Sequence, residues 1–460
     1  MSWAGEELAS AELGDTRRVL RLMRMVESLA DHAERSIPRS FDSEAEVKAA
    51  YRFWENEDIG WREILAPHGQ RTAHRAAAYP VVLVAQDTTE IDLTSHPATA
   101  GLGYLASPYS RGVLLHSCLA ISPQGVPLGI VDQQMWTRPV EQLGQRHQRR
   151  AKPTADKESQ RWIDGLHACE AALAKHPCVI VIGDRESDIY DLFAEPRQPH
   201  VHLLVRVAHE KRRVEHPARY LGDALAAAPV LGQMEVSVPR KQNRPPRRAR
   251  LQVRAMTLAI HAPRDRPGPA VRLQFVLVEE VDPPAGEAPI RWLLATTLAV
   301  DTLEDAVQCV QWYVYRWRIE RFHFTLKSGY QVEERQFGNV GNVERALATF
   351  SIVAWRVLWL MLAAREQPDT PASVVLNTDE WQALYAATHR RGKQPLPLAP
   401  PTLGEATRML GRLGGHLGRK GDGQPGVKAI WRGLARLHDI TIGWRMAHAP
   451  PLAVNLVGND

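Results

Sequence analysis

Two short apolar runs constrain the fold of this 460-residue chain more than any other feature. Residues 81–85 and 179–183 are apolar and β-branched, which is typical of strands buried on both faces of a sheet. Asp87 follows the first run and Asp184 follows the second. Because α/β folds place ligand sites at the carboxyl ends of such strands, the runs predict an α/β fold with an acidic site. Taken singly, either aspartate is more typical of a turn or a helix cap.

Residues 313–327 (YVYRWRIERFHFTLK) predict a helix with one strongly polar face. At 100° per residue, four polar side chains fall within about 60° of one another. They are Tyr313, Arg316, Glu320 and Lys327. A carboxylate among cationic and hydrogen-donating groups suits a metal ligand beside the phosphates of a polyanion. The alternative is a surface helix whose charges pair at i,i+4.

The neighbouring stripe of this helix is apolar and is expected to face a core. It consists of Val310, Val314, Trp317 and Phe324. On the polar face, Glu320 adds a third carboxylate to Asp87 and Asp184. Three carboxylates are enough to hold two divalent metal ions for in-line phosphoryl transfer.

With these motifs the chain resembles the DDE transposases of the insertion-sequence-4 group, and most closely their transposon-five branch. The Y-x2-R-x3-E-x6-K signature of the group is matched by the four polar residues of the 313–327 stretch. Its D-T-T motif is matched at residues 87–89, and its D-R-E-x-D-I motif at residues 184–189. The resemblance spans nearly the whole chain. It is densest at residues 13–59, 81–92, 179–190 and 292–365.

The stretch from residue 79 to residue 207 alternates predicted strands and helices. In chain order we expect strands at 81–85, 112–121 and 126–136, a helix at 156–175, a strand at 179–183, a helix at 189–193 and a strand at 202–207. This β-β-β-α-β-α-β order is that of a ribonuclease-H-like fold, which the resemblance implies for a catalytic core over residues 76–370. Such a fold would place Asp87 and Asp184 on adjacent central strands.

The segment at about residues 208–290 interrupts this core and is rich in proline and arginine. Alternating apolar and polar residues predict antiparallel strands at 233–238, 251–260 and 271–278. The resemblance implies an all-β insertion here, between the second and third acids. It is weakest in this segment.

The two ends of the chain are predicted to be helical. Residues 1–75 resemble the domain that recognises transposon ends, and the resemblance implies that Arg21 and Arg52 contact end DNA. A solvated basic face is the alternative for these arginines. Residues 371–460 resemble a dimerisation domain, which implies a homodimer in a complex of paired ends.

Other DNA contacts follow from the resemblance alone. Tyr313 and Arg316 would grip a phosphate beside a flipped base, and Lys327 would hold a phosphate near the cut. Trp292 would stack on the flipped base, although a tryptophan at the start of a strand is more often part of a core. Arg206 would contact DNA near the second acid, with an internal salt bridge as the alternative.

The resemblance implies a cut-and-paste transposase acting on transposon inverted-repeat ends and target DNA. Asp87, Asp184 and Glu320 would coordinate two Mg²⁺ ions, for which Mn²⁺ can substitute. The expected steps are end nicking, hairpin formation and opening, and strand transfer. Two alternatives stay open: a stand-alone metal-dependent nuclease, and a catalytically silent DNA-binding derivative or transposition inhibitor.

Composition sets looser limits than the motifs. A net charge of +5 and a pI near 9.0 permit a nucleic-acid partner without establishing one. The four cysteines form no C-x2-C pair, which favours reduced thiols over disulfides or zinc ligands. We expect no secretion signal, no apolar run long enough to cross a membrane and no membrane partner. The expected location is the bacterial cytoplasm, on the nucleoid when bound to DNA.

Overall fold

The computed structural model describes residues 2–32, 37–144, 152–238, 245–265, 267–329, 331–389, 395–419 and 422–448. Two compact units contain these residues. The sheet unit comprises residues 65–323 and 336–340. The terminal unit comprises residues 1–64, 324–335 and 341–460, so it brings together both ends of the chain. The division into three domains at residues 75 and 370 stays a prediction.

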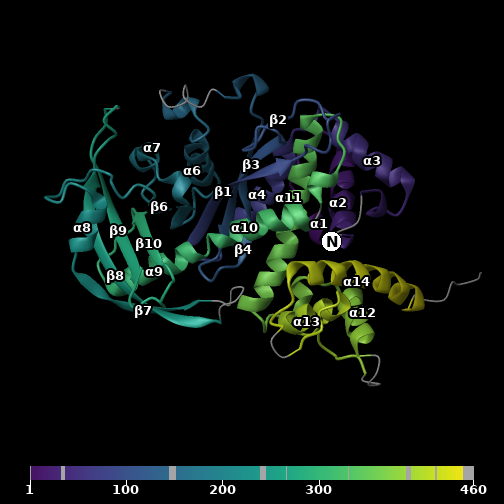
Figure 1. Cartoon of the computed structure of the whole chain (residues 1–460). Helices are drawn as coiled ribbons and strands as arrows, with labels where there is room; N and C mark the ends of the chain where they lie inside the picture. The colour runs from purple at the N-terminus through teal and green to yellow at the C-terminus, as the bar shows by residue number, and fades with distance from the viewer. Residues whose placement is uncertain are drawn as a thin grey trace, which may run out of the picture. The chain divides into compact units, whose positions relative to one another are not determined.

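A ten-stranded mixed sheet forms the framework of the sheet unit (Figure 1). Its first strands are β1 (Val82–Asp92), β2 (Gly103–Tyr104), β3 (Arg111–Ile121) and β4 (Pro127–Trp136). β3 runs antiparallel to β1, β2 and β4, and short connections join it to β2 and β4. β5 (Val179–Gly183) and β6 (Val201–Arg206) follow helices α6 (Gln160–Ala172) and α7 (Tyr190–Ala194). β5 runs parallel to β1, and β6 runs parallel to β5.

The parallel pairing of β1 with β5 sets the level of the two aspartates. Ala85 lies opposite Ile182, so Asp87 and Asp184 each follow this last pair by two residues. The apolar residues of both strands are fully buried, as their composition predicts. The expected adjacency of the Asp87 and Asp184 strands is therefore confirmed.

The sheet continues into the segment that interrupts the predicted core. β6 pairs with β10 (Arg291–Thr296), which also pairs with β9 (Val271–Glu280). Beyond β9 lie β8 (Arg247–Ile260) and β7 (Val230–Val238), all antiparallel. The three strands predicted there are confirmed. The prediction of an all-β insertion is wrong, because α8 (Leu221–Ala227) lies within it and buries Leu221, Ala224 and Leu225 at helical spacing.

The single helix expected over residues 313–327 is interrupted twice. α9 (Leu303–Val314) ends, α10 (Trp317–Phe324) begins after two turn residues, and η5 (Thr325–Gly329) is a π-helical turn. The predicted apolar stripe is also wrong beyond Val310, because Val314, Trp317 and Phe324 are exposed by 41–54%. Tyr313 and Arg316 are instead exposed by only 2% and 6%. The prediction assumed a rotation of 100° per residue along one continuous helix, and this periodicity is lost at the break between α9 and α10.

The terminal unit consists mainly of helices. They are α1 (Trp3–Glu7), α2 (Thr16–Asp31), η1 (Ile37–Arg39), α3 (Glu44–Glu55), most of α11 (Val340–Glu366), α12 (Thr378–Thr388), α13 (Leu403–Leu413) and α14 (Val427–His448). α4 (Trp61–Ala76) passes from this unit into the sheet unit. Asp15 and Ser43 cap α2 and α3 by accepting backbone N–H groups from the first turn of each helix. A mixed α/β fold with helices at both ends of the chain is confirmed.

Helix α11 is the core helix of the terminal unit. By length and composition it could cross a membrane, so the expectation that no apolar run is long enough was wrong. However, 89% of its most apolar window is buried inside the protein. Its Thr349 hydroxyl accepts the Trp54 indole N–H at 3.2 Å, and its Arg345 donates to the Trp54 carbonyl. These contacts join α11 to α3, as expected of a core helix.

Helices α13 and α14 approach closely at glycines. A Cβ on Gly433 would lie 2.1 Å from the carbonyl oxygen of Leu410, and one on Gly414 would lie 1.7 Å from that of Ala429. Gly443 lies ten residues further along α14, and a Cβ there would meet no atom within 4 Å. The same helix therefore contains one glycine required by packing and one that is not.

We predict opposite effects for Gly433→Ala and Gly443→Ala. The first should lower the free energy of unfolding by about 1–3 kcal/mol, because two backbones must separate to admit a methyl group. The second should raise it by about 0.5–1 kcal/mol, the ordinary gain for alanine over glycine in a helix. Urea denaturation followed by far-ultraviolet circular dichroism measures both. Equal effects of the two changes would contradict this account of the α13–α14 contact.

Candidate active site

Three elements of the sheet unit supply the predicted carboxylates. Asp87 lies on β1 opposite Ser117 of β3. Asp184 follows β5 and caps η4 (Arg185–Ser187), where its carboxylate accepts the Glu186 backbone N–H at 2.8 Å. Glu320 lies in the first turn of α10.

Asp87 has a strongly perturbed acidity. Burial, together with the negative charges of Asp184 and Glu320, raises the pKa of its carboxyl group to about 7. The Thr88 backbone N–H and the Arg316 guanidinium act in the opposite direction. Two acids close enough to shift a third create a local excess of negative charge, which a cation would relieve.

Arg316 supplies positive charge to this cluster. Its Nη2 lies 2.6 Å from Oε1 of Glu320, and its Nη1 lies 3.9 Å from Oδ2 of Asp87. The guanidinium therefore contacts both acids from a buried position. It also lies beside the ring of Tyr313, with its central carbon 5.9 Å from the ring centre.

The donor set suits a hard divalent cation. Carboxylate oxygens are the ligands that Mg²⁺ and Mn²⁺ prefer, and the charges of Asp184 and Glu320 add to burial in raising the pKa of Asp87. The three carboxylates nevertheless do not form a closed ligand cage. In the described parts of the chain, the one triplet of ligand-type side chains with donor atoms all within 4.8 Å of one another lies in the terminal unit.

His323 is a site residue that the sequence reasoning missed. It lies three residues after Glu320, one turn further along α10, and is 5% exposed. Its Nδ1 is 3.9 Å from Oδ2 of Asp87, and its Nε2 is 3.3 Å from the Ser117 hydroxyl. The i,i+3 spacing from Glu320 was the available signal.

Arg161 of α6 connects the two aspartate-bearing segments and was also missed. Its Nε donates to the Thr88 hydroxyl at 2.8 Å, and its Nη2 donates to Glu186 at 2.7 Å. Burial lowers the pKa of this guanidinium, although the negative charge of Glu186 acts in the opposite direction and raises it. Because Thr88 follows Asp87 and Glu186 lies two residues after Asp184, Arg161 positions both acids.

Asp188 holds the segment after Asp184 in place. Its buried carboxylate pairs with Arg212 at 2.5 Å and accepts the backbone N–H groups of Ala208 and His209 at 2.8 and 2.9 Å. These bonds tie the D-R-E-x-D-I motif to the chain leaving β6. A fully partnered buried carboxylate of this kind is a structural residue rather than a metal ligand.

An aromatic and basic group lies at the start of α10. The rings of Trp292 and Tyr313 meet edge to face with centres 6.2 Å apart. Burial raises the pKa of Tyr313, whereas the nearby charges of Arg316 and Arg206 lower it. The Tyr313 hydroxyl is buried, and no described atom lies in hydrogen-bonding geometry with it. Arg206 also donates to the Arg291 carbonyl at 3.4 Å.

The remaining predicted residues lie in the terminal unit. Lys327 is in the π-helical turn η5 and pairs with Glu333 at 2.9 Å. Arg21 lies on α2 and is half-buried, whereas Arg52 lies on α3 and is exposed. The sheet unit therefore contains the three acids together with Tyr313, Arg316, Trp292 and Arg206. The terminal unit contains Lys327, Arg21 and Arg52.

Two protein-family models match parts of the chain, and both describe transposases. The transposase DNA-binding family model matches residues 1–59, which contain α1 to α3. A second model, the transposase Tn5 dimerisation domain, matches residues 352–450, which contain most of α11 and all of α12 to α14. The matches support a transposase with a DNA-binding region and a dimerisation region. In particular, the chain is similar to the Tn5 type of transposase, and both matches lie outside the sheet unit.

The raised pKa of Asp87 predicts a pH-dependent stability of the metal-free protein. The folded pKa of about 7 exceeds the usual value of 3.8, so this contribution is fully present below about pH 4 and is lost as pH rises through 7. Relative to Asp87→Asn, the wild type should lose roughly 3 kcal/mol between about pH 5 and pH 8. Denaturation of both proteins in chelator measures this difference. A difference that does not change with pH would contradict the raised pKa of Asp87.

Proposed function

We propose that this protein is a DDE transposase of the insertion-sequence-4 group, which moves DNA by cut and paste. The observation that carries the proposal is Asp87, whose pKa is raised by burial and by the charges of Asp184 and Glu320, in a chain that matches two transposase families. The sheet order, with β1 between β3 and β5 and with β6 beyond β5, supports a ribonuclease-H-like core. The expected location is the bacterial cytoplasm, on the nucleoid.

Asp87, Asp184 and Glu320 would hold two Mg²⁺ ions, or Mn²⁺ in their place. When bound, these ions would lower the pKa of the attacking water or 3′-hydroxyl and stabilise the leaving 3′-oxygen. Arg161 would keep both aspartate segments in place while DNA binds, because it bonds to Thr88 and Glu186 in the free protein. Asp188 would hold the Asp184 segment against the chain that follows β6. No covalent protein–DNA intermediate is required.

Arg316 would change partners during the reaction. In the free protein its guanidinium neutralises Glu320 and Asp87, which are the acids needed as ligands. A DNA phosphate would accept the same guanidinium in a charge-assisted pair and release Glu320. The buried Tyr313 hydroxyl, which lies near the Arg316 guanidinium, would donate to that phosphate. Lys327 would hold a second phosphate near the cut.

The proposed reaction has four steps. Water nicks the element end, and the freed 3′-hydroxyl attacks the opposite strand to form a hairpin. The hairpin is then reopened and joined to target DNA. Trp292 is half-buried at the start of β10, and its ring would stack on a flipped base.

The proposed partners are transposon inverted-repeat ends, target DNA and a second copy of the chain. Arg21 and Arg52 would contact end DNA, and Arg206 would contact DNA beside the second acid. The dimerisation match supports a homodimer in the paired-end complex.

Loss of a carboxylate should abolish every chemical step. We predict that Glu320→Gln removes Mg²⁺-dependent nicking, hairpin formation and strand transfer by at least about 1,000-fold, because one metal ligand is lost. The measurement is a denaturing gel of a linear fragment bearing the element's own end, with Mg²⁺ or with chelator. Glu304→Gln, an exposed carboxylate on α9, is the matched control and should be fully active.

The outcomes of this gel separate the alternatives. End binding without cleavage by the wild type would favour the silent DNA-binding derivative. Degradation of DNA irrespective of the element end would favour the nuclease. Full activity of Glu320→Gln would contradict the assignment of the third acid.

Base stacking predicts a selective defect. Trp292→Ala should slow hairpin formation by roughly tenfold or more relative to nicking, because stacking on an aromatic ring contributes about 1–3 kcal/mol per base. Trp292→Phe keeps an aromatic face and should retain most of the rate. Arg316→Ala should resemble Trp292→Ala. Single-turnover rates of each step test this, and equal losses in nicking and hairpin formation would exclude the base-flipping role.

A further inference from the structure

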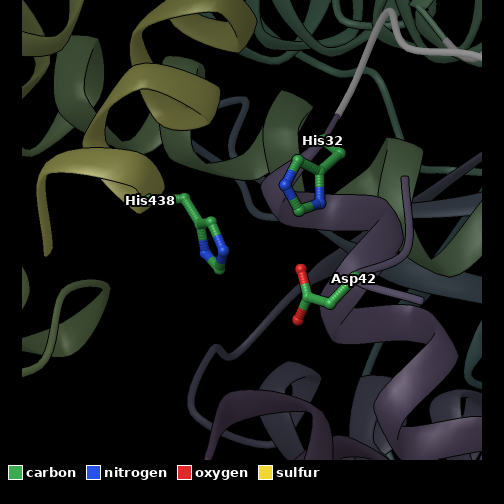
Figure 2. Close-up of side chains that lie close together, drawn as sticks. All are labelled: His32, Asp42 and His438. Atoms are coloured by element: carbon green, nitrogen blue, oxygen red, sulfur yellow. The ribbon is translucent and has the colours of Figure 1, made fainter. Parts of the chain in front are cut away.

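A second group of metal-ligand side chains lies in the terminal unit. His32 follows the last residue of α2, Asp42 lies in the turn before α3, and His438 lies within α14. Figure 2 shows the three side chains facing a common space. One donor atom from each lies within 4.8 Å of the other two. Nothing in the proposed DNA chemistry uses these residues.

His32 has one ring nitrogen committed and one available. Its Nδ1 lies 3.0 Å from the carbonyl oxygen of Ser28. Because a carbonyl only accepts, Nδ1 carries the proton and Nε2 carries the free lone pair. The residue is 94% buried, since 6% of its surface is exposed, and its Nε2 bonds to no described residue.

His438 has the same arrangement. Its Nδ1 lies 3.0 Å from Oδ2 of Asp31, and its Nε2 is buried without a hydrogen-bond partner among the described residues. A buried polar atom left unpaired costs about 1–3 kcal/mol. Histidines that bind metals are held in this way, with one nitrogen on a carboxylate or carbonyl and the other on the ion.

Asp42 supplies the third donor and an open side. It is exposed, and its carboxylate makes no hydrogen bond or ion pair to the described residues. Together with Asp31 behind His438, it would balance the two positive charges of a divalent ion. Two imidazoles and one carboxylate favour zinc-type transition metals, because Mg²⁺ and Ca²⁺ prefer oxygen ligands throughout.

We propose that Nε2 of His32, Nε2 of His438 and the Asp42 carboxylate form a Zn²⁺ site, with water as the fourth ligand. Tetrahedral zinc with bonds of about 2.0–2.2 Å separates its donors by about 3.3–3.6 Å. The donor atoms now lie within 4.8 Å of one another, so side-chain rotation must move them closer by about 1 Å to bind zinc. The exposed Asp42 side chain is free to rotate in this way. The site is built by residues 400 positions apart in the chain, so only the folded terminal unit forms it.

The proposed ion would join two regions with different family matches. His32 and Asp42 lie within the stretch matched by the transposase DNA-binding model, and His438 lies within the stretch matched by the dimerisation model. An ion that binds only the folded arrangement stabilises it by mass action. Zinc would therefore fasten the α2–α3 region to α14.

Zinc binding by the full-length chain tests the proposal without DNA. The parent protein should carry Asp87→Asn and Glu320→Gln, so that the acidic site does not contribute ions. After chelator treatment and dialysis, it should bind one equivalent of Zn²⁺, and Co²⁺ in its place should give the visible absorption of a four-coordinate ion. A competing chelating dye measures the dissociation constant.

Single substitutions should grade the affinity. His438→Gln and Asp42→Asn should each weaken zinc binding by more than about 100-fold, whereas Asp31→Asn, behind His438, should weaken it by about 10–100-fold. His389→Gln is the matched control, because His389 stacks on Tyr385 in the same unit and should bind zinc as the parent does.

Zinc should also raise the melting temperature of the parent but not of Asp42→Asn. If His438→Gln unfolds, the exposed Asp42 decides the question, since its change leaves the core intact. Absence of zinc binding in the parent, or unchanged binding in Asp42→Asn, would overturn the proposal and leave two histidines in ring contact, with His32 bonded to Ser28 and His438 to Asp31. Neither result bears on the acidic site, which is disabled throughout.

Discussion

The parallel pairing of β1 with β5 is the constraint on which the acidic site depends. Its register delivers Asp87 and Asp184 from neighbouring strands at the same level, and α10 adds Glu320. Burial of like charges is unfavourable, and the raised pKa of Asp87 records that cost. The fold tolerates it because Arg316 contacts both Asp87 and Glu320. In the metal-free site, the Arg316 guanidinium therefore supplies the positive charge that the proposed chemistry would take from metal ions.

The break between α9 and α10 determines which side chains reach the acids. It directs Tyr313 and Arg316 inward and leaves Trp317 exposed. A second layer, made by Arg161 and Asp188, fixes the backbone that carries the aspartates. Reactive groups held by a rigid surrounding layer are expected of a site that must bind a polyanion without rearranging its framework.

The terminal unit depends on α11 and on contacts between the chain ends. α3 packs on α11, where Trp54 hydrogen-bonds with Thr349 and Arg345. α13 and α14 pack closely at Gly414 and Gly433. The stretches matched by the DNA-binding and dimerisation families consequently share one compact unit. His438 links them chemically, because its Nδ1 lies 3.0 Å from Oδ2 of Asp31 and its ring centre lies 4.8 Å from that of His32.

The sequence by itself determined the strands at residues 81–85 and 179–183, the helical character of both chain ends, and the three candidate acids. These features depend on local composition and spacing, which a linear pattern retains. Only the tertiary structure decided the break after Val314, the burial of Arg316 and the contacts of Arg161 and His323. The grouping of His32, Asp42 and His438 is the extreme case. Its members are separated by hundreds of residues, so their proximity is a property of helix packing, which no local pattern encodes.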